Sequence, residues 1–159
     1  MDHTEAIMVL NNVLSDEFRE KIISLTDHKA KDKLTIKEGM NDNVRNVCGY
    51  HLNFESATNL FYWNYIKKEI ERLYYFYKIK FPLLHSYEIN QIDLLKYGNG
   101  GKYTFHTDNI GGRKLNRTLS VIMNLNNDYE GGDLIFGDQK FKEIKRIKLK
   151  SGSVVFFPS

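Results

Sequence analysis

The sequence predicts a single α+β domain in which helices come first and short strands follow. Residues 15–25 and 57–77 carry apolar side chains at helical spacing. From residue 88 onward the pattern changes to short apolar runs separated by turn residues. The length of 159 residues suits one domain, residues 1–159. This order is typical of helices packed on one side of a β-structure.

The first half, residues 1–85, is predicted to be the helical support of the domain. Residues 6–10 form an apolar run that suits a first strand. Ser15 is expected to cap the helix that follows it, since a serine hydroxyl can accept a hydrogen bond from the first turn. Residues 29–43 are polar and predict a loop or a weak edge segment, whereas residues 44–54 look strand-like.

The second helix, residues 57–77, is expected to pack through a broad apolar stripe and to end before Pro82. The stripe comprises Leu60, Tyr62, Trp63, Ile66, Ile70, Leu73 and Phe76.

The second half, residues 86–159, is predicted to form the β-rich core. Its expected strands are residues 88–97, 102–108, 117–126, 134–136, 143–149 and 153–157. Asn99 and Gly100 separate the first two, and Asn-Gly is a strong hairpin signal. The turn should therefore return the chain so that the second of these strands lies beside the first.

Composition favours a soluble cytoplasmic protein. The formal charge of +3 is a mild excess that does not by itself argue for nucleic acid. A lone cysteine, Cys48, allows no internal disulfide and suits a reducing compartment. No apolar run has the length of a signal peptide or a membrane span. We expect no membrane partner and no nucleic-acid partner.

His106 and Asp108 are the candidate metal ligands. They stand two residues apart on a predicted strand, where side chains at such spacing project from the same face. They would supply two of the three ligands of a 2-His-1-carboxylate triad, which is typical of non-haem Fe(II) oxygenases. No histidine follows His106. His51 and His85 stay open as a third ligand.

Four segments carry a family resemblance. These are VLNNVLSDEFREKIISL, QIDLLKYGNGGKYTFHTDN, NRTLSVIMNLNNDYEGGDLIFGD and LKSGSVVFFPS. In this order they resemble the Fe(II)/2-oxoglutarate dioxygenases of the prolyl 4-hydroxylase type. The resemblance implies a double-stranded β-helix, or jelly roll, that uses Fe(II), 2-oxoglutarate and O₂, with ascorbate as a candidate cofactor.

The resemblance also implies roles for single residues. His106 and Asp108 match the proximal iron ligands, and Tyr97 matches a tyrosine that reaches 2-oxoglutarate; its alternative is packing at a strand end. Asn124 stands where some relatives hold the distal carboxylate of 2-oxoglutarate with a tyrosine. Arg117 stands where relatives carry an arginine near the peptide substrate, although a solvated arginine fits its place equally well.

Alternation along residues 118–125 separates two faces of a strand. Thr118, Ser120, Ile122 and Asn124 form one face, and Leu119, Val121, Met123 and Leu125 form the other. The partly polar face is the better candidate for the cofactor side.

Within the family, a distal iron-binding histidine and a basic anchor for 2-oxoglutarate follow the strand that ends this sequence. The resemblance therefore implies that the natural chain continues past Ser159 and that the present one lacks its last strands. A chain with two of three ligands is expected to be a poor catalyst.

The predicted function is hydroxylation of a C–H bond, with a prolyl residue of a peptide or protein as the leading substrate. The alternatives are hydroxylation or demethylation of a free amino acid or nucleobase, and a non-catalytic peptide-binding module. A nucleobase enzyme should show a basic groove with stacking aromatics, and only residues 140–150 are strongly basic. Substrate choice would lie in loops such as residues 29–43 and 109–116. The sequence leaves the oligomeric state open.

Overall fold

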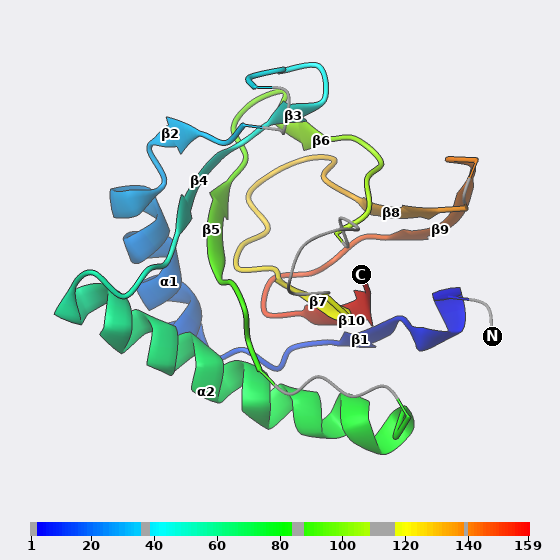
Figure 1. Ribbon diagram of the computed structural model, residues 1–159, viewed down its shortest axis with the longest axis horizontal. Coiled ribbons are helices and arrows are strands. Elements are labelled where there is room, and N and C mark those ends of the chain that lie inside the picture. The colour runs from blue at the N-terminus through cyan, green and yellow to red at the C-terminus, as the bar shows by residue number, and fades with distance from the viewer. Residues whose placement is uncertain (1–2, 36–38, 84–87, 109–116, 139) are drawn as a thin grey trace.

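Two helices pack on the outside of a set of antiparallel sheets (Figure 1). A computed structural model describes residues 3–35, 39–83, 88–108, 117–138 and 140–159. The helices are α1 (Asp16–Lys29) and α2 (Ala57–Lys80), preceded by a short 3₁₀ turn, η1 (His3–Ala6). No helix in these ranges is long and apolar enough to cross a membrane.

The strands of the described residues form four small sheets with the neighbour orders β1-β10-β7, β2-β4-β5, β3-β6 and β8-β9. Their bounds are β1 Met8–Leu10, β2 Asp32–Lys33, β3 Arg45–Asn46, β4 Cys48–His51, β5 Asp93–Lys96, β6 Lys102–Tyr103, β7 Leu119–Met123, β8 Leu134–Gly137, β9 Glu143–Ile147 and β10 Val154–Pro158.

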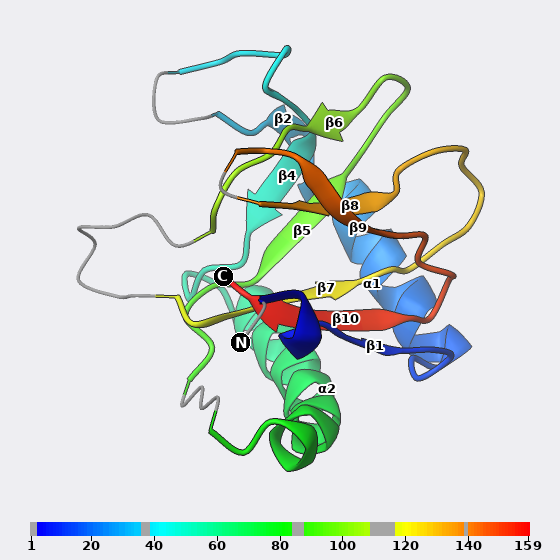
Figure 2. The same ribbon diagram turned by 90° about the vertical axis from the view of Figure 1, so that its right-hand side faces the viewer.

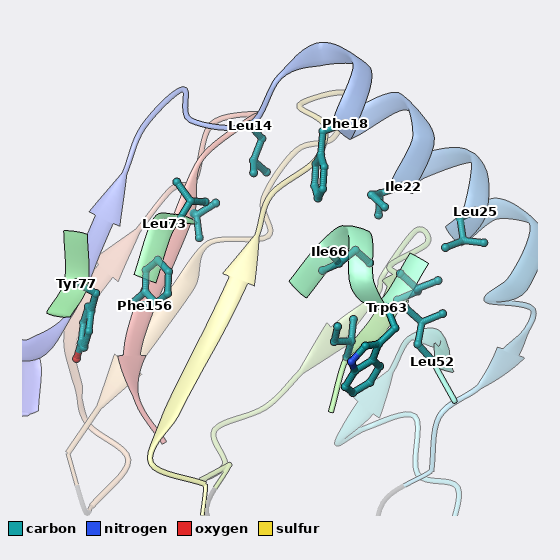
Figure 3. Packing of buried hydrophobic residues seen from close by; sticks show 13 residues of the cluster. Leu14, Phe18, Ile22, Leu25, Leu52, Trp63, Ile66, Leu73, Tyr77 and Phe156 are labelled. Carbon is teal, nitrogen blue, oxygen red and sulfur yellow. The ribbon is translucent and has the colours of Figure 1, made fainter. Parts of the chain in front are cut away.

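Strand β10 is the centre of the largest core. It lies between β1 and β7, and Phe156 is opposite Met8 on one side and Val121 on the other. The Phe156 ring is fully buried and stacks on Tyr77 of α2 at 5.4 Å between centroids. Figure 3 shows this contact continuing into the apolar side chains between α1 and α2.

The opposite face of β10 is covered by the β8–β9 hairpin, which lies above the β1-β10-β7 sheet in Figure 2. Phe157 alternates with Phe156 and meets Phe136 of β8 edge to face, at 5.1 Å between centroids. The sheet therefore has one face towards the helices and one face towards β8, as a strand with period-two alternation requires.

The predicted helix starts are confirmed, but the predicted apolar stripe is too wide. The Ser15 hydroxyl accepts a hydrogen bond from the Phe18 amide at 3.2 Å, which is the expected cap. In α2, Leu60 is 46% exposed and Phe76 is 48% exposed. Both lie to the side of the face through which α2 meets the sheets. That face buries Trp63, Ile66, Leu73 and Tyr77.

Two predicted strands are shorter or divided. The expected strand at 44–54 is divided at the buried Val47 into β3 and β4, which join different sheets. The expected strand at 88–97 retains only β5. The division arises because β4 pairs with β5 while β3 pairs with β6. The polar segment 29–43 contains the short β2, which pairs with β4; residues 109–116 lie outside the described ranges.

The predicted hairpin between β5 and β6 is wrong. The turn itself forms, since the Gly101 amide donates to the Gly98 carbonyl at 2.8 Å and Gly100 takes the required positive φ of 70°. The two strands then pair with different partners, because β4 and β3 offer separate edges to them. The expected strand at 102–108 is also wrong beyond Tyr103.

Tyr77 makes stability sensitive to alkaline pH. Its hydroxyl donates to the Ala6 carbonyl at 3.0 Å, and burial, with a smaller effect of Tyr74, raises its pKa to about 12. The folded state keeps a proton that an unfolded tyrosine loses near pH 10. We therefore expect the free energy of unfolding to fall by about 1 to 3 kcal/mol as pH rises from 10 to 12.

The Tyr77→Phe variant, compared with the wild type by urea unfolding at pH 7 to 12, isolates this contribution. At pH 7 it should cost about 1 kcal/mol for the lost hydrogen bond, and its alkaline loss should be smaller than that of the wild type. Tyr75→Phe, whose residue is 63% exposed, is the matched control. An equal alkaline loss in Tyr77→Phe would contradict the assignment.

Candidate metal site

His106 and Asp108 lie side by side, with His106 Nε2 3.3 Å from Asp108 Oδ1. Their proximity agrees with the sequence analysis, but its stated reason, a shared strand, does not hold, because β6 ends at Tyr103. The segment that follows is fixed by other contacts. The Thr104 amide donates to the Val44 carbonyl at 2.9 Å, which extends the attachment of β6 to β3 by one residue.

The segment is also held from the side of β8. A side-chain carbon added at Gly137 would lie 2.8 Å from Phe105, so the Phe105 ring packs directly on the backbone of β8. A larger residue at this position would have to displace the Phe105 ring. Phe105 and Thr104 thus fix the chain on two sides immediately before His106.

The His106 imidazole has a defined orientation. Its Nδ1 lies 2.7 Å from the Thr104 carbonyl oxygen, an acceptor, so Nδ1 carries the proton and Nε2 faces Asp108. Burial alone lowers the pKa of His106. Hydrogen bonds to Asp108 and to the Thr104 carbonyl, with the negative charge of Asp108, outweigh burial and raise the pKa above its usual 6.5.

Asp108 is held as a carboxylate. The hydrogen bond with His106 is the largest effect that lowers the pKa of Asp108, whereas burial raises this pKa. A hydrogen bond from Ser120 and the charges of His106 and Arg117 lower it further. The Ser120 hydroxyl donates to Asp108 Oδ2 and lies 2.8 Å from the Ser159 hydroxyl. Asp108 is therefore ionised throughout the neutral range.

Ser120 belongs to the partly polar face of β7 that the sequence analysis assigned to the cofactor side. The other face of this strand packs against the apolar core through Leu119, Val121 and Met123. The alternation could have identified Ser120 itself as the partner of Asp108, since it is the polar residue at the middle of that face.

Tyr97 follows β5 and lies near the pair. The residue is 49% exposed as a whole, yet burial around its hydroxyl raises its pKa. The charge of Arg45 opposes this rise, while Tyr103 and Asp108 add to it. Tyr97 is thus close enough to Asp108 for their charges to interact, and its role towards 2-oxoglutarate stays a prediction.

Arg117 is also close enough for its charge to act on Asp108. Its guanidinium donates to the Gln91 side-chain oxygen, and its charge lowers the pKa of Asp108. Gln91 in turn donates to Asp93, which pairs with His51 on the neighbouring strand. Sequence reasoning missed Gln91, because a single glutamine between strands carries no signal of its own.

Asn124 is not brought to the pair. Its amide donates to the carbonyls of Asn126 at 3.0 Å and Leu149 at 3.3 Å, and its oxygen accepts a hydrogen bond from the Tyr129 hydroxyl. It lies four residues along the strand from Ser120, a distance of about 13 Å. Its role as an anchor for 2-oxoglutarate stays a prediction.

The other described histidines belong to other elements of the fold. His3 is in η1, His28 is in the last turn of α1, and His51 pairs with Asp93 across β4 and β5. His85 lies outside the described residues. In the part of the chain that the structure describes, no three histidine, cysteine or acidic side chains gather as a metal site. The described site therefore offers two adjacent ligands.

The fold resembles that of two solved prolyl hydroxylases. A Pseudomonas putida prolyl-4-hydroxylase aligns with a TM-score of 0.68 at 15% identity, over 97% of this chain and 81% of its own. The viral collagen prolyl hydroxylase of Paramecium bursaria Chlorella virus-1, in its 2-oxoglutarate complex, aligns with a TM-score of 0.63 at 18% identity, over 96% and 77%. No curated protein matches the chain.

The fold is thus the jelly-roll fold of the prolyl-hydroxylase oxygenases, and it places an imidazole beside a carboxylate. Residues 92–159, which include this pair, match the model of the 2OG-Fe(II) oxygenase superfamily. The chain therefore resembles the 2OG-Fe(II) oxygenases in the sequence of residues 92–159, and the prolyl hydroxylases in its fold. The family uses Fe(II), 2-oxoglutarate and O₂ in oxidative chemistry.

Proposed function

We propose that the protein hydroxylates a prolyl residue of a peptide or protein, with Fe(II) held by His106 and Asp108. The observation that carries the proposal is the 3.3 Å approach of His106 Nε2 to an ionised Asp108. Imidazole nitrogen with carboxylate oxygen is the ligand set of non-haem Fe(II) oxygenases, so the two residues fit this metal.

The protein prepares both ligands for the metal. Because Nδ1 of His106 donates to a backbone carbonyl, the neutral ring directs its Nε2 lone pair away from that bond and towards Asp108. Ser120 occupies Asp108 Oδ2 and leaves Oδ1 facing His106. When bound, Fe(II) with 2-oxoglutarate and O₂ supplies the oxidant that hydroxylates the C–H bond.

Binding of the organic groups is assigned to the residues around the pair. Tyr97 binds 2-oxoglutarate through its hydroxyl, whose raised pKa keeps it a hydrogen-bond donor. Arg117, held by Gln91 beside the pair, orients the peptide substrate. Asn124 contributes to cosubstrate binding only if its present hydrogen bonds are exchanged. The proposed site also has a third iron ligand and a basic residue that binds the distal carboxylate of 2-oxoglutarate. Ascorbate serves as a reductant.

Support for the prolyl substrate comes from the two structural neighbours, which are prolyl hydroxylases of low sequence identity. The lone Cys48 supports action in a reducing cytoplasm.

The test is conversion of 2-oxoglutarate to succinate by the natural protein with Fe(II), with and without a proline-rich peptide. We expect that the peptide stimulates turnover and that His106→Ala lowers turnover by about a hundredfold or more. Even mutations of residues that only support metal ligands lower metal affinity or activity 10- to 100-fold. The matched control is His28→Ala, an exposed histidine in the last turn of α1. Turnover that survives His106→Ala, or that never appears, would contradict the proposal.

A further inference from the structure

Three side chains form a layered stack that ends on His106. The Tyr103 ring lies almost parallel to the His106 imidazole, with 3.6 Å between centroids and 17° between planes. On the other side of Tyr103 lies the Arg45 guanidinium, whose central carbon is 4.6 Å from the ring centroid. Arg45 and Tyr103 are opposite each other in the β3–β6 pairing, so the backbone itself sets this register.

The stack restricts the one motion that the hydrogen bond to Thr104 leaves open. That bond fixes Nδ1, but the imidazole can still tilt about it. A flat ring at 3.6 Å on one face blocks such a tilt, and Asp108 lies at the ring edge. An imidazole that cannot tilt keeps Nε2 directed towards Asp108 before any metal arrives.

The outer layer holds the tyrosine in turn. A guanidinium over an aromatic face is attracted by about 0.5 to 2 kcal/mol. Arg45 Nη1 donates to the Thr35 carbonyl at 3.3 Å, while its buried Nε has no hydrogen-bond partner among the described residues. Stacking on Tyr103 is therefore a principal contact of the guanidinium, and this contact helps to hold the Tyr103 ring in place.

We propose that Tyr103 is a positioning residue for the metal ligand His106, with Arg45 as its support. The inference rests on the proposed function, because it assigns to Tyr103 the pre-orientation of a ligand for Fe(II). It acts through the ring rather than through the hydroxyl, since the stacking contact is made by the ring face. Phenylalanine at position 103 should therefore replace tyrosine, and an aliphatic residue should not.

The experiment measures Mn(II) and Co(II) affinity of the metal-free natural protein by electron paramagnetic resonance and calorimetry. Tyr103→Leu should raise Kd about tenfold, as loss of a contact that orients a metal ligand does. Tyr103→Phe should stay within about twofold of the wild type. Tyr75→Leu, on the exposed side of α2, is the control for general loss of aromatic surface. An unchanged Kd in Tyr103→Leu would overturn the proposal.

A second measurement does not depend on the folding of Tyr103→Leu. In the nuclear magnetic resonance spectrum of the wild type, the carbon-bound protons of His106 should resonate upfield of their unstacked positions, because they lie over an aromatic ring. The shift should persist in Tyr103→Phe. His106 protons at unstacked positions in the wild type would overturn the proposal.

Failure of this inference is distinguishable from failure of the proposed function. If His106→Ala abolishes metal binding while Tyr103→Leu leaves Kd unchanged, His106 is a ligand and only the positioning role fails. If His106→Ala itself leaves Kd unchanged, the metal site is wrong and both fail.

Discussion

Replacing Asp108 with asparagine is expected to lower 2-oxoglutarate turnover by at least about a hundredfold, because the change replaces one carboxylate oxygen of the proposed ligand with an amide nitrogen and removes its negative charge. Mutation of residues that hydrogen-bond to metal ligands already lowers metal affinity or activity 10- to 100-fold. Loss of a ligand itself should therefore reach the upper end of that range. The carboxylate is ionised at every working pH, since its pKa lies below the usual 3.8. The loss should therefore be independent of pH between 6 and 9.

The same variant has a second readout in the metal-free protein. Asp108 raises the pKa of His106 through its hydrogen bond and its charge, whereas burial lowers it. Without the carboxylate, the pKa of His106 should fall, which nuclear magnetic resonance titration can measure. Asp16→Asn is the matched control, since Asp16 pairs with Arg19 at the start of α1. A pKa of His106 that is the same in Asp108→Asn as in the wild type would contradict the described contact.

Replacing Phe156 with alanine is expected to lower the free energy of unfolding by about 3 to 5 kcal/mol, the usual cost of removing a buried phenylalanine ring. The residue is fully buried in the middle strand of its sheet, and its ring stacks on Tyr77 and lies near Tyr74. Met8 and Val121 lie opposite it on the two adjacent strands.

Urea unfolding followed by circular dichroism measures this effect. Phe156→Leu, which restores most of the volume, should cost no more than about half as much. Phe76→Ala is the control, because Phe76 lies 48% exposed on a helix where alanine is a better helix former. A cost for Phe156→Ala no larger than that for Phe76→Ala would contradict the position of β10 at the core.

The elements that the sequence predicts well are those whose signals are local. Ser15 precedes an apolar helical pattern, and both the cap and the helix form. Alternation in residues 118–125 predicts the two faces of β7, and the structure has them. Both patterns depend on neighbours within a few residues, where backbone geometry alone relates position to direction.

The errors concern which strands pair. The turn at Gly100 forms as expected, but nothing local in the sequence indicates that β5 and β6 would pair with β4 and β3 instead of with each other. Likewise, β6 ends at Tyr103 because the next residues turn towards β8, where Phe105 packs on Gly137. These outcomes are set by contacts between residues far apart in the chain, which a periodic pattern does not encode.

The site was predicted only in part for the same reason. The spacing of His106 and Asp108 in the sequence predicts that they act together. The groups that orient them come from other parts of the fold and are Tyr103, Ser120 and the Thr104 carbonyl. Their contributions depend on β3, β6 and β7 being assembled, and no short motif specifies that assembly.

The place of β10 between β1 and β7 has a consequence for the kinetics of folding. Met8 pairs with Phe156, so this central sheet joins residues from near the beginning and the end of the sequence. Closing such a long loop costs entropy before any contact is gained, and domains rich in distant pairings fold in milliseconds to seconds. This edge of β1 therefore stays unpaired until the residues of β10 have been synthesised.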